Sequence, residues 1–174
     1  SLNKNIFSIF FEKIRPLAFF NDFAHHITIN NNINEISQFA FLFSNIISII
    51  FNHNYSSLSL GKSTFRSCRN LNYIDLSRVI IDEIPKRCFE SCSSLKSVNI
   101  PSVKYIREQA FNDCNRLENI DLSNVEIIES KAFFNCNIKS LIFTNTLSRI
   151  DNLAFAYNNI DYLEFGNNIF SNIT

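Results

Sequence analysis

The chain has 174 residues, of which 46% are hydrophobic and 18% charged, and this composition favours a folded domain over a disordered segment. Its 16 basic and 16 acidic side chains give a net charge of zero, which removes the usual electrostatic argument for nucleic-acid binding. The two glycines, Gly61 and Gly166, lie far apart and exclude a P-loop or a glycine-rich dinucleotide turn, so we expect no cofactor.

A repeat of 22 to 24 residues runs along the sequence from its first copy near residue 19. Its anchor is a phenylalanine that mostly follows an alanine and a five-residue lead beginning with isoleucine. One unit is too small to bury a core of its own, so the units must stack on one another as a solenoid. The seven anchors are Phe19, Phe41, Phe65, Phe89, Phe111, Phe133 and Phe155.

The copies follow two templates, short and long, which differ by one residue in the spacing between the anchor and the apolar pair at the end of the copy. Copies one, two, six and seven are short, as in the second copy, where Ile49 and Phe51 follow the anchor Phe41 by eight and ten residues. Copies three to five hold one more residue between the anchor and the same apolar pair. The fifth copy shows the longer pattern: Phe111-x-x-Cys114-x-x-Leu117-x-x-Ile120-x-Leu122.

The end of each copy predicts a β-strand, because apolar and polar residues alternate there. In the third copy Ile74 and Leu76 face inward, whereas Tyr73 and Asp75 face outward. We expect equivalent strands of successive copies to pair in parallel as one sheet. The Ala-Phe-x-x-Cys segment predicts a short helical turn on the opposite side, with Asn and Asp at the corners accepting left-handed backbone angles in place of glycine.

This pattern resembles the BspA-like class of leucine-rich repeats over essentially the whole chain, most clearly from Phe65 to Phe165. Copies one and two depart from it, with Asp22 and Ser44 in the cysteine position. The resemblance implies a right-handed α/β-type leucine-rich-repeat solenoid, with a parallel sheet on one face and short helical turns and loops on the other. We expect residues 1–174 to form a single solenoid of about seven repeats, as a segment of a longer array.

Four cysteines share one repeat position and would lie in a column, one coil apart. The position suits a small buried side chain, a role that free cysteine fills well, better than it suits a metal site or a disulfide. Cys88 and Cys92 form an isolated Cys-x-x-x-Cys without a histidine, so we expect no zinc. The column consists of Cys68, Cys92, Cys114 and Cys136.

Catalytic chemistry finds no support in the pattern. The histidines His25, His26 and His53 share no motif with a serine, cysteine or carboxylate, so the sequence predicts a protein that is not an enzyme. Carboxylates on the strand face, such as Asp121 and Glu164, are most simply part of a solvated polar surface.

The outward strand positions form the first candidate protein-binding surface. They vary from copy to copy and include tyrosine, which is enriched in interface cores. A recognition surface would show such variation, and so would a surface under no selection. The candidate residues are Tyr73, Asp75, Ser97, Asn99, Asn119, Asp121, Ser140, Ile142, Tyr162 and Glu164.

A second candidate surface lies beside the first two anchors, where Phe20, Phe23, Leu42 and Phe43 occupy positions that are charged or polar in later copies. Apolar residues in these positions indicate a covered patch. Its cover is either an N-terminal cap formed by residues 6–11 or a partner protein.

Two functions remain open. Members of the BspA-like class are typically surface or secreted proteins of bacteria and protists that act in adhesion, so the resemblance implies a recognition module at a cell surface that binds a host protein. The Asn-, Ile- and Phe-rich composition would fit a protist with an AT-rich genome. The alternative is an intracellular structural repeat protein of a cytoplasmic or cytoskeletal assembly, which the unpaired cysteines favour. The longest apolar stretch, residues 39–51, is shorter than the roughly 20 residues that span a bilayer, so we expect no membrane insertion within this segment.

Overall fold

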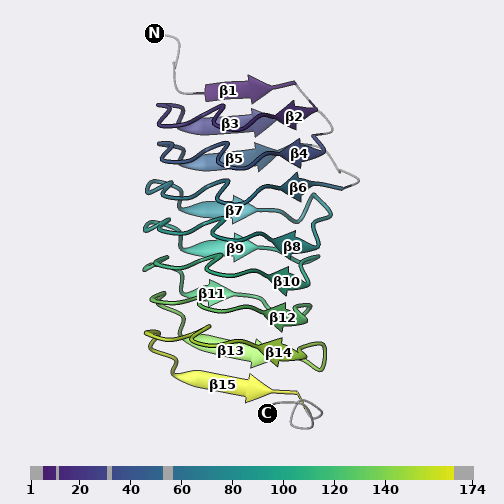
Figure 1. The fold of residues 1–174 in the computed structure, drawn as a ribbon, viewed down its shortest axis with the longest axis vertical. Helices are drawn as coiled ribbons and strands as arrows, with labels where there is room; N and C mark the ends of the chain where they lie inside the picture. The colour runs from purple at the N-terminus through teal and green to yellow at the C-terminus, as the bar shows by residue number, and fades with distance from the viewer. Residues whose placement is uncertain (1–5, 11, 31–32, 53–56, 167–174) are drawn as a thin grey trace.

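A computed structural model describes residues 6–10, 12–30, 33–52 and 57–166 of the chain. It shows a parallel β-solenoid in which each coil stacks on the one before (Figure 1). A coil runs through a two-residue strand, a turn that carries the anchor phenylalanine, and a longer strand. We number the coils one to seven from the anchor Phe19 to the anchor Phe155. Residues 167–174, where we expected the start of another coil, lie outside the described part.

The longer strands form the first column of the solenoid, which we call the strand face (Figure 1). Its short-template strands are four residues long, and its long-template strands have only two or three. All pairings along it are parallel, as the stacking of equivalent repeats predicts. In chain order the strands are β1 (Ile6–Ile9), β3 (His26–Ile29), β5 (Ser48–Phe51), β7 (Tyr73–Asp75), β9 (Ser97–Asn99), β11 (Asn119–Ile120), β13 (Ser140–Phe143) and β15 (Tyr162–Phe165).

A second column of two-residue strands, which the sequence patterns did not predict, covers another side of each coil (Figure 1). Each of these strands ends on the aliphatic residue that opens the five-residue lead. The strands are β2 (Lys13–Ile14), β4 (Glu35–Ile36), β6 (Ser59–Leu60), β8 (Glu83–Ile84), β10 (Tyr105–Ile106), β12 (Ile127–Ile128) and β14 (Arg149–Ile150). The glycine after β6, Gly61, is needed for a close approach, because a Cβ there would collide with the backbone of Gln38.

The turn side of each coil corrects two expectations. The described residues contain no helix, so the predicted helical turns are wrong, and the anchor lies between two tight turns instead. The residues two before and two after every anchor have left-handed backbone angles, such as Leu17 and Asn21 around Phe19. Only three of these 14 residues are Asn or Asp, and neither glycine is among them. Left-handed angles in this fold are therefore not confined to Asn, Asp and Gly.

Backbone hydrogen bonds between coils explain these angles. In coil two the N–H groups of Phe39, Phe41 and Phe43 donate to the carbonyls of Lys62, Thr64 and Arg66 in coil three, at 3.2, 2.8 and 3.0 Å. The alternating left-handed residues aim every second N–H along the solenoid axis. The same three bonds recur in coils three to six, coil one makes two of them through Phe19 and Asn21, and we call this series the turn-side ladder.

The anchors form the centre of the core. Consecutive anchor rings from Phe19 to Phe155 stack nearly parallel, with centroids 4.8 to 5.3 Å apart. The five inner anchors are fully buried, and the two outer ones are partly buried at the ends of the stack. The ring spacing is close to the ~4.8 Å between adjacent strands, so the ring stack and the sheets advance together.

The strand face is interrupted twice. The strands β5 and β7 belong to different sheets, as do β11 and β13. We call these interruptions seam 1 and seam 2. Both lie where the repeat changes template, from short to long at seam 1 and from long to short at seam 2. On the long-template side the strand stops early, because the carboxylates of Asp75 and Asp121 accept hydrogen bonds from the N–H groups of Ser77 and Ser123, both at 2.9 Å.

Candidate protein-binding surfaces

All ten predicted strand-face residues lie at the surface, exposed or half-buried, at outward positions of β7 to β15. The register brings equivalent residues side by side: Tyr73 lies beside Ser97, and Asp75 lies beside Asn99. The tyrosines Tyr73 and Tyr162 are 44% and 53% exposed, enough to contact a partner with a large part of each ring.

Polar contacts hold parts of the strand face in place. The Asn99 side chain donates to the Asp75 carboxylate at 3.0 Å. Partial burial alone would raise the pKa of the Asp75 carboxyl, but the hydrogen bonds from Ser77 and Asn99 outweigh it and lower the pKa. The carboxylate is therefore ionised at neutral pH. The hydroxyl of Tyr162 donates to Glu164 at 2.6 Å, and this bond raises the pKa of the tyrosine.

Each seam contains a hollow. Seam 1 holds one of about 390 Å³, lined by Ile50 on β5 and by Asp75 and its neighbours on the β7 side. Seam 2 holds one of about 350 Å³, lined by Asp121 beyond β11 and by Ile142 on β13. Sequence reasoning missed both hollows, although the change of template marks their position.

The second candidate surface, formed by Phe20, Phe23, Leu42 and Phe43, is only partly packed together. The rings of Phe20 and Phe43 meet edge to face, with centroids 6.1 Å apart, whereas Leu42 is half-buried. Phe20, Phe43 and Phe23 are 51%, 46% and 76% exposed. The predicted cap does not cover them: residues 6–9 form β1, which pairs with β3 on the strand face, and Phe11 lies outside the described residues.

A second aromatic pair, which the sequence patterns did not predict, lies on the turn side at the other end of the solenoid. The rings of Phe134 and Tyr157 meet edge to face with centroids 4.9 Å apart. They occupy the same two repeat positions as Phe20 and Phe43. The middle coils carry charged residues near these positions, such as the ion pair of Arg66 and Glu90 at 2.6 Å.

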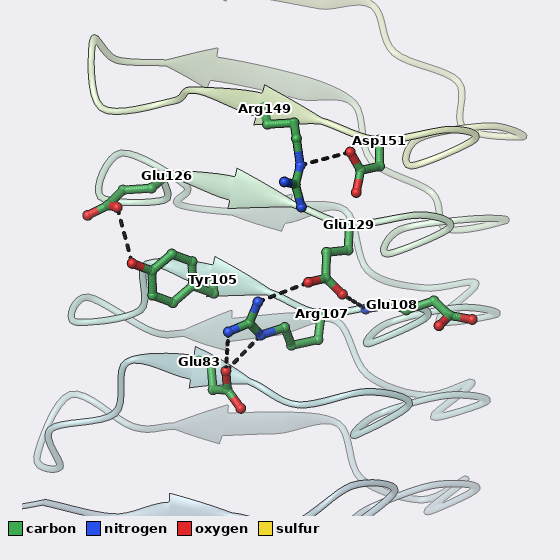
Figure 2. A network of polar contacts seen from close by, with 8 residues as sticks. All are labelled: Glu83, Tyr105, Arg107, Glu108, Glu126, Glu129, Arg149 and Asp151. Atoms are coloured by element: carbon green, nitrogen blue, oxygen red, sulfur yellow. Dashed lines mark hydrogen bonds and ion pairs between the residues drawn. The ribbon is translucent and has the colours of Figure 1, made fainter.

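The second column of strands carries a ladder of charged side chains (Figure 2). Arg107 lies between two carboxylates of neighbouring coils, Glu83 at 2.6 Å and Glu129 at 2.9 Å, and its guanidinium stacks 4.9 Å from the ring centre of Tyr105. Hydrogen bonds and ion pairs to both glutamates raise the already high pKa of Arg107, against the opposing effect of burial. The arginine is saturated with partners inside the chain, so the geometry fits a bridge between coils.

The cysteine column consists of hydrogen-bond donors. Each thiol points at the carbonyl of the preceding anchor, as Cys114 does toward Phe89 at 3.1 Å. The same contact recurs from Cys68, Cys92 and Cys136, at 3.0 to 3.1 Å. Asn158 takes the position in coil seven and donates its amide to Phe133 at 2.7 Å. The position therefore holds a donor in coils three to seven, whereas in coils one and two the side chains of Asp22 and Ser44 accept from the N–H groups of Ala24 and Ile46.

Burial raises the pKa of the cysteine thiols, to about 12 for Cys92 and Cys136. The thiols are protonated at neutral pH, whereas metal binding and nucleophilic attack need the thiolate. The isolated pair Cys88 and Cys92 shares this burial and has no third ligand, because the described residues contain no group of three His, Cys, Asp or Glu side chains able to hold a metal ion.

The remaining features belong to the scaffold. A hollow of about 670 Å³ at the first coil is lined by Phe7, Ile9 and Phe19, on the side that in later coils is covered by the preceding coil. His26 bonds to Ser48 at 2.8 Å, and His53 lies outside the described residues. Within the part that the structure describes, no helix is long and apolar enough to cross a membrane.

Comparisons with known proteins agree with this architecture. Crystal structures of leucine-rich repeat proteins from Eubacterium ventriosum and Bacteroides ovatus match with TM-scores of 0.76 and 0.51, at 18% and 19% identity. The matches cover 91% and 87% of this chain but 44% and 54% of those chains. The pneumococcal vaccine antigen PcpA matches with a TM-score of 0.55 at 18% identity, over 94% of this chain and 40% of its own. This chain therefore spans about half, or less, of each of these proteins.

No curated protein matches the sequence. The family described as BspA type leucine rich repeat region matches in six copies, over residues 1–103 and 82–173. Together these ranges cover nearly the whole chain, and they contain all seven anchors. The chain belongs to the BspA-type leucine-rich repeat family.

Proposed function

We propose that the chain is a non-enzymatic module displayed at a cell surface, where it binds another protein through its strand face. One observation carries the proposal: an unvarying stack of phenylalanine anchors presents outward side chains that differ from coil to coil. This arrangement lets a fold change what it binds without changing its core. Surface display draws support from the family and from the likeness to a vaccine antigen.

The chemistry of the strand face suits a protein partner. Its outward positions combine half-exposed tyrosines with isolated exposed isoleucines and small polar residues. Tyrosine supplies large contact area and a hydroxyl together, and it is enriched where interfaces are tightest. The face also offers two hollows at the seams that can accept side chains of a partner.

The test is capture of a surface protein by the full chain, compared across variants. We expect Tyr73→Ala and Tyr162→Ala to weaken capture while the melting curve stays unchanged, because both side chains are largely solvent-exposed. Tyr157→Ala, which removes an exposed tyrosine from the turn side, is the matched control and should bind normally. Capture that survives both strand-face substitutions contradicts the proposal.

A structural role within a larger assembly is the second candidate, and the exposed aromatic pairs of the turn side favour it. Phe20 with Phe43 at one end, and Phe134 with Tyr157 at the other, would suit a partner that covers that side. Under this alternative, Phe43→Ser abolishes assembly and Tyr73→Ala has no effect. The free cysteines do not separate the two candidates, because burial and hydrogen bonding account for their unpaired state in either compartment.

A further inference from the structure

One column of outward side chains on the strand face has a symmetric order. Its part from coil two to coil six has Asn99 as the middle member, and the column continues into Thr28 of coil one and Glu164 of coil seven. Apolar side chains stand at the two ends of this part, with an acidic side chain next to each of them inside it. In order along the solenoid axis this part reads Ile50, Asp75, Asn99, Asp121 and Ile142.

The end members are accessible. Ile50 and Ile142 are 51% and 56% exposed, although they lie in four-residue strands whose alternate residues are buried. Each forms one wall of a seam hollow, and an aspartate of the column lies across the seam in the same hollow. The two hollows are thus similar in size and lining, and they lie at the two boundaries of the long-template coils.

Hydrogen bonds bridge each seam at both of its ends. Seam 1 is bridged at its far end by the Arg78 guanidinium, which donates to the carbonyl of Asn52 at 3.4 Å. Seam 2 is bridged by the hydroxyl of Thr144, which donates to the carbonyl of Ser123 at 2.5 Å. At the near end the N–H of Asn72 and that of Lys139 cross the two seams to coils two and five. Because both ends are closed, the openings between them have a fixed length.

Charge defines the occupant of the column. The outward residues along the strand face from β5 to β13, in this row and in the parallel row beside it, include two carboxylates and no lysine or arginine. Asp75 is ionised, and its hydrogen-bond partner Asn99 is neutral. Arg78 at the rim of seam 1 donates to the Asn52 carbonyl and offsets part of the Asp75 charge, so Asp121 is the less compensated of the two carboxylates. A ligand that lies along the column meets two carboxylates between the isoleucine walls of the two hollows.

We propose, on the basis of the protein-binding function above, that this column binds an extended segment of a partner protein in which two basic residues lie between two apolar ones. Adjacent strands lie ~4.8 Å apart, so Ile50 and Ile142 are separated by four intervals, or roughly 19 Å. An extended chain advances ~3.4 Å per residue and presents alternate side chains to one face. With the first apolar residue of the segment numbered 0, residues 0 and 6 then reach the hollows, and residues 2 and 4 reach Asp75 and Asp121.

The experiment uses the full chain and the synthetic peptide Leu-Ser-Lys-Ser-Lys-Ser-Leu, with binding followed by fluorescence anisotropy. The matched peptide Lys-Ser-Leu-Ser-Leu-Ser-Lys has the same composition with the order inverted. We expect the inverted peptide to bind about tenfold more weakly, because its cations meet the apolar hollows and its leucines meet the carboxylates. Equal affinity for both peptides overturns the proposal, since it would show attraction by net charge alone.

Two sets of variants locate the site. The double variant Asp75→Asn with Asp121→Asn keeps the acceptor oxygens that end the strands, and it should lower affinity about tenfold. Glu126→Gln with Glu129→Gln removes the same charge from the second column of strands and should leave affinity unchanged. Ile50→Ser with Ile142→Ser should also weaken binding. A peptide that binds all variants alike overturns the assignment.

The outcome separates this inference from the function on which it rests. If capture of a surface protein depends on Tyr73 but the peptide does not bind in its designed order, the strand face recognises proteins and the basic-segment proposal is wrong. If only the designed peptide binds tightly and its affinity depends on the aspartates, the column is the binding site for a basic segment. This conclusion holds even if capture of a surface protein depends on the turn side instead.

Discussion

The turn side and the strand face of the same solenoid respond differently where the spacing between anchor and strand changes by one residue. The turn-side ladder and the anchor stack continue through all seven coils, with ring spacings of 5.1 Å across both seams. The strand face loses its backbone pairing at the same two places. The extra residue of the long template is therefore absorbed between the anchor and the strand.

This difference indicates which side sets the register of the coils. The buried anchors and the turn-side hydrogen bonds hold successive coils in phase, and the strands follow where their lengths agree. The strand face is then free to vary in sequence and in pairing, as a recognition surface requires. The predictions below test this division, beginning with the substitution that should cost most.

Truncation of an anchor should break the stack. Phe111 is fully buried between the rings of Phe89 and Phe133, so Phe111→Ala should lower the free energy of unfolding by about 3–5 kcal/mol, the range for truncating a core phenylalanine. Denaturant titration measures the loss. In the same coil, Ile120→Ala removes a half-buried strand residue beside seam 2 and should cost less than about 2 kcal/mol.

These two variants decide the comparison. A loss below about 1 kcal/mol for Phe111→Ala would contradict the role of the anchor, given the cost that is usual for a core phenylalanine. A larger loss for Ile120→Ala than for Phe111→Ala would show that the strand face, and not the turn side, holds the register.

The thiol donors should contribute less than the anchors. Cys114→Ala removes the thiol donor to the buried carbonyl of Phe89, which still accepts from the N–H of Cys92 at 3.0 Å, and we expect it to lower the free energy of unfolding by about 0.5–1.5 kcal/mol. Cys114→Ser keeps a donor in the same place and should cost less than the alanine variant. Denaturant titration of both variants provides the measurement. Equal losses would mean that the thiol only fills space.

Protonation of Asp75 should have the smallest effect. Its pKa is lowered in the folded state, so its charge adds stability above the unfolded-state pKa of about 3.9, and this contribution disappears as the pH falls through the lower folded pKa. We expect Asp75→Asn to be slightly less stable than the parent chain at pH 7 and equally stable near about pH 2. Urea titrations at the two pH values test this, and a difference that grows on acidification would contradict the sign.

Much of the core followed from the sequence, because apolar spacing is a direct record of burial. The anchors, the thiol column and the inward residues of the strands, such as Ile74 and Leu141, are buried as the repeat predicts. The outward residues lie at the surface as expected, but their role in binding stays a proposal.

The turn side did not follow, because its geometry is not local. Residues such as Arg87, Gln109 and Lys131 have no preference for left-handed angles, which cost side chains with a Cβ about 1–2 kcal/mol each. Hydrogen bonds to the next coil impose these angles, and a single copy of the repeat does not contain that information. The seams were missed for a similar reason, since they arise from a mismatch between two neighbouring copies.

The continuity of the anchor stack has a consequence for how such a chain can evolve. In most folds, inserting one residue into a strand-bearing segment shifts every side chain beyond it to the opposite face. Here the next anchor restores the phase: in the fourth and fifth copies the extra residue before the strand is offset by one residue fewer after it, so such an exchange changes only one coil. Each such event would also create or erase a hollow at the boundary with a neighbour of the other template. Small insertions and deletions would thus diversify the binding surface in steps that point substitutions cannot make.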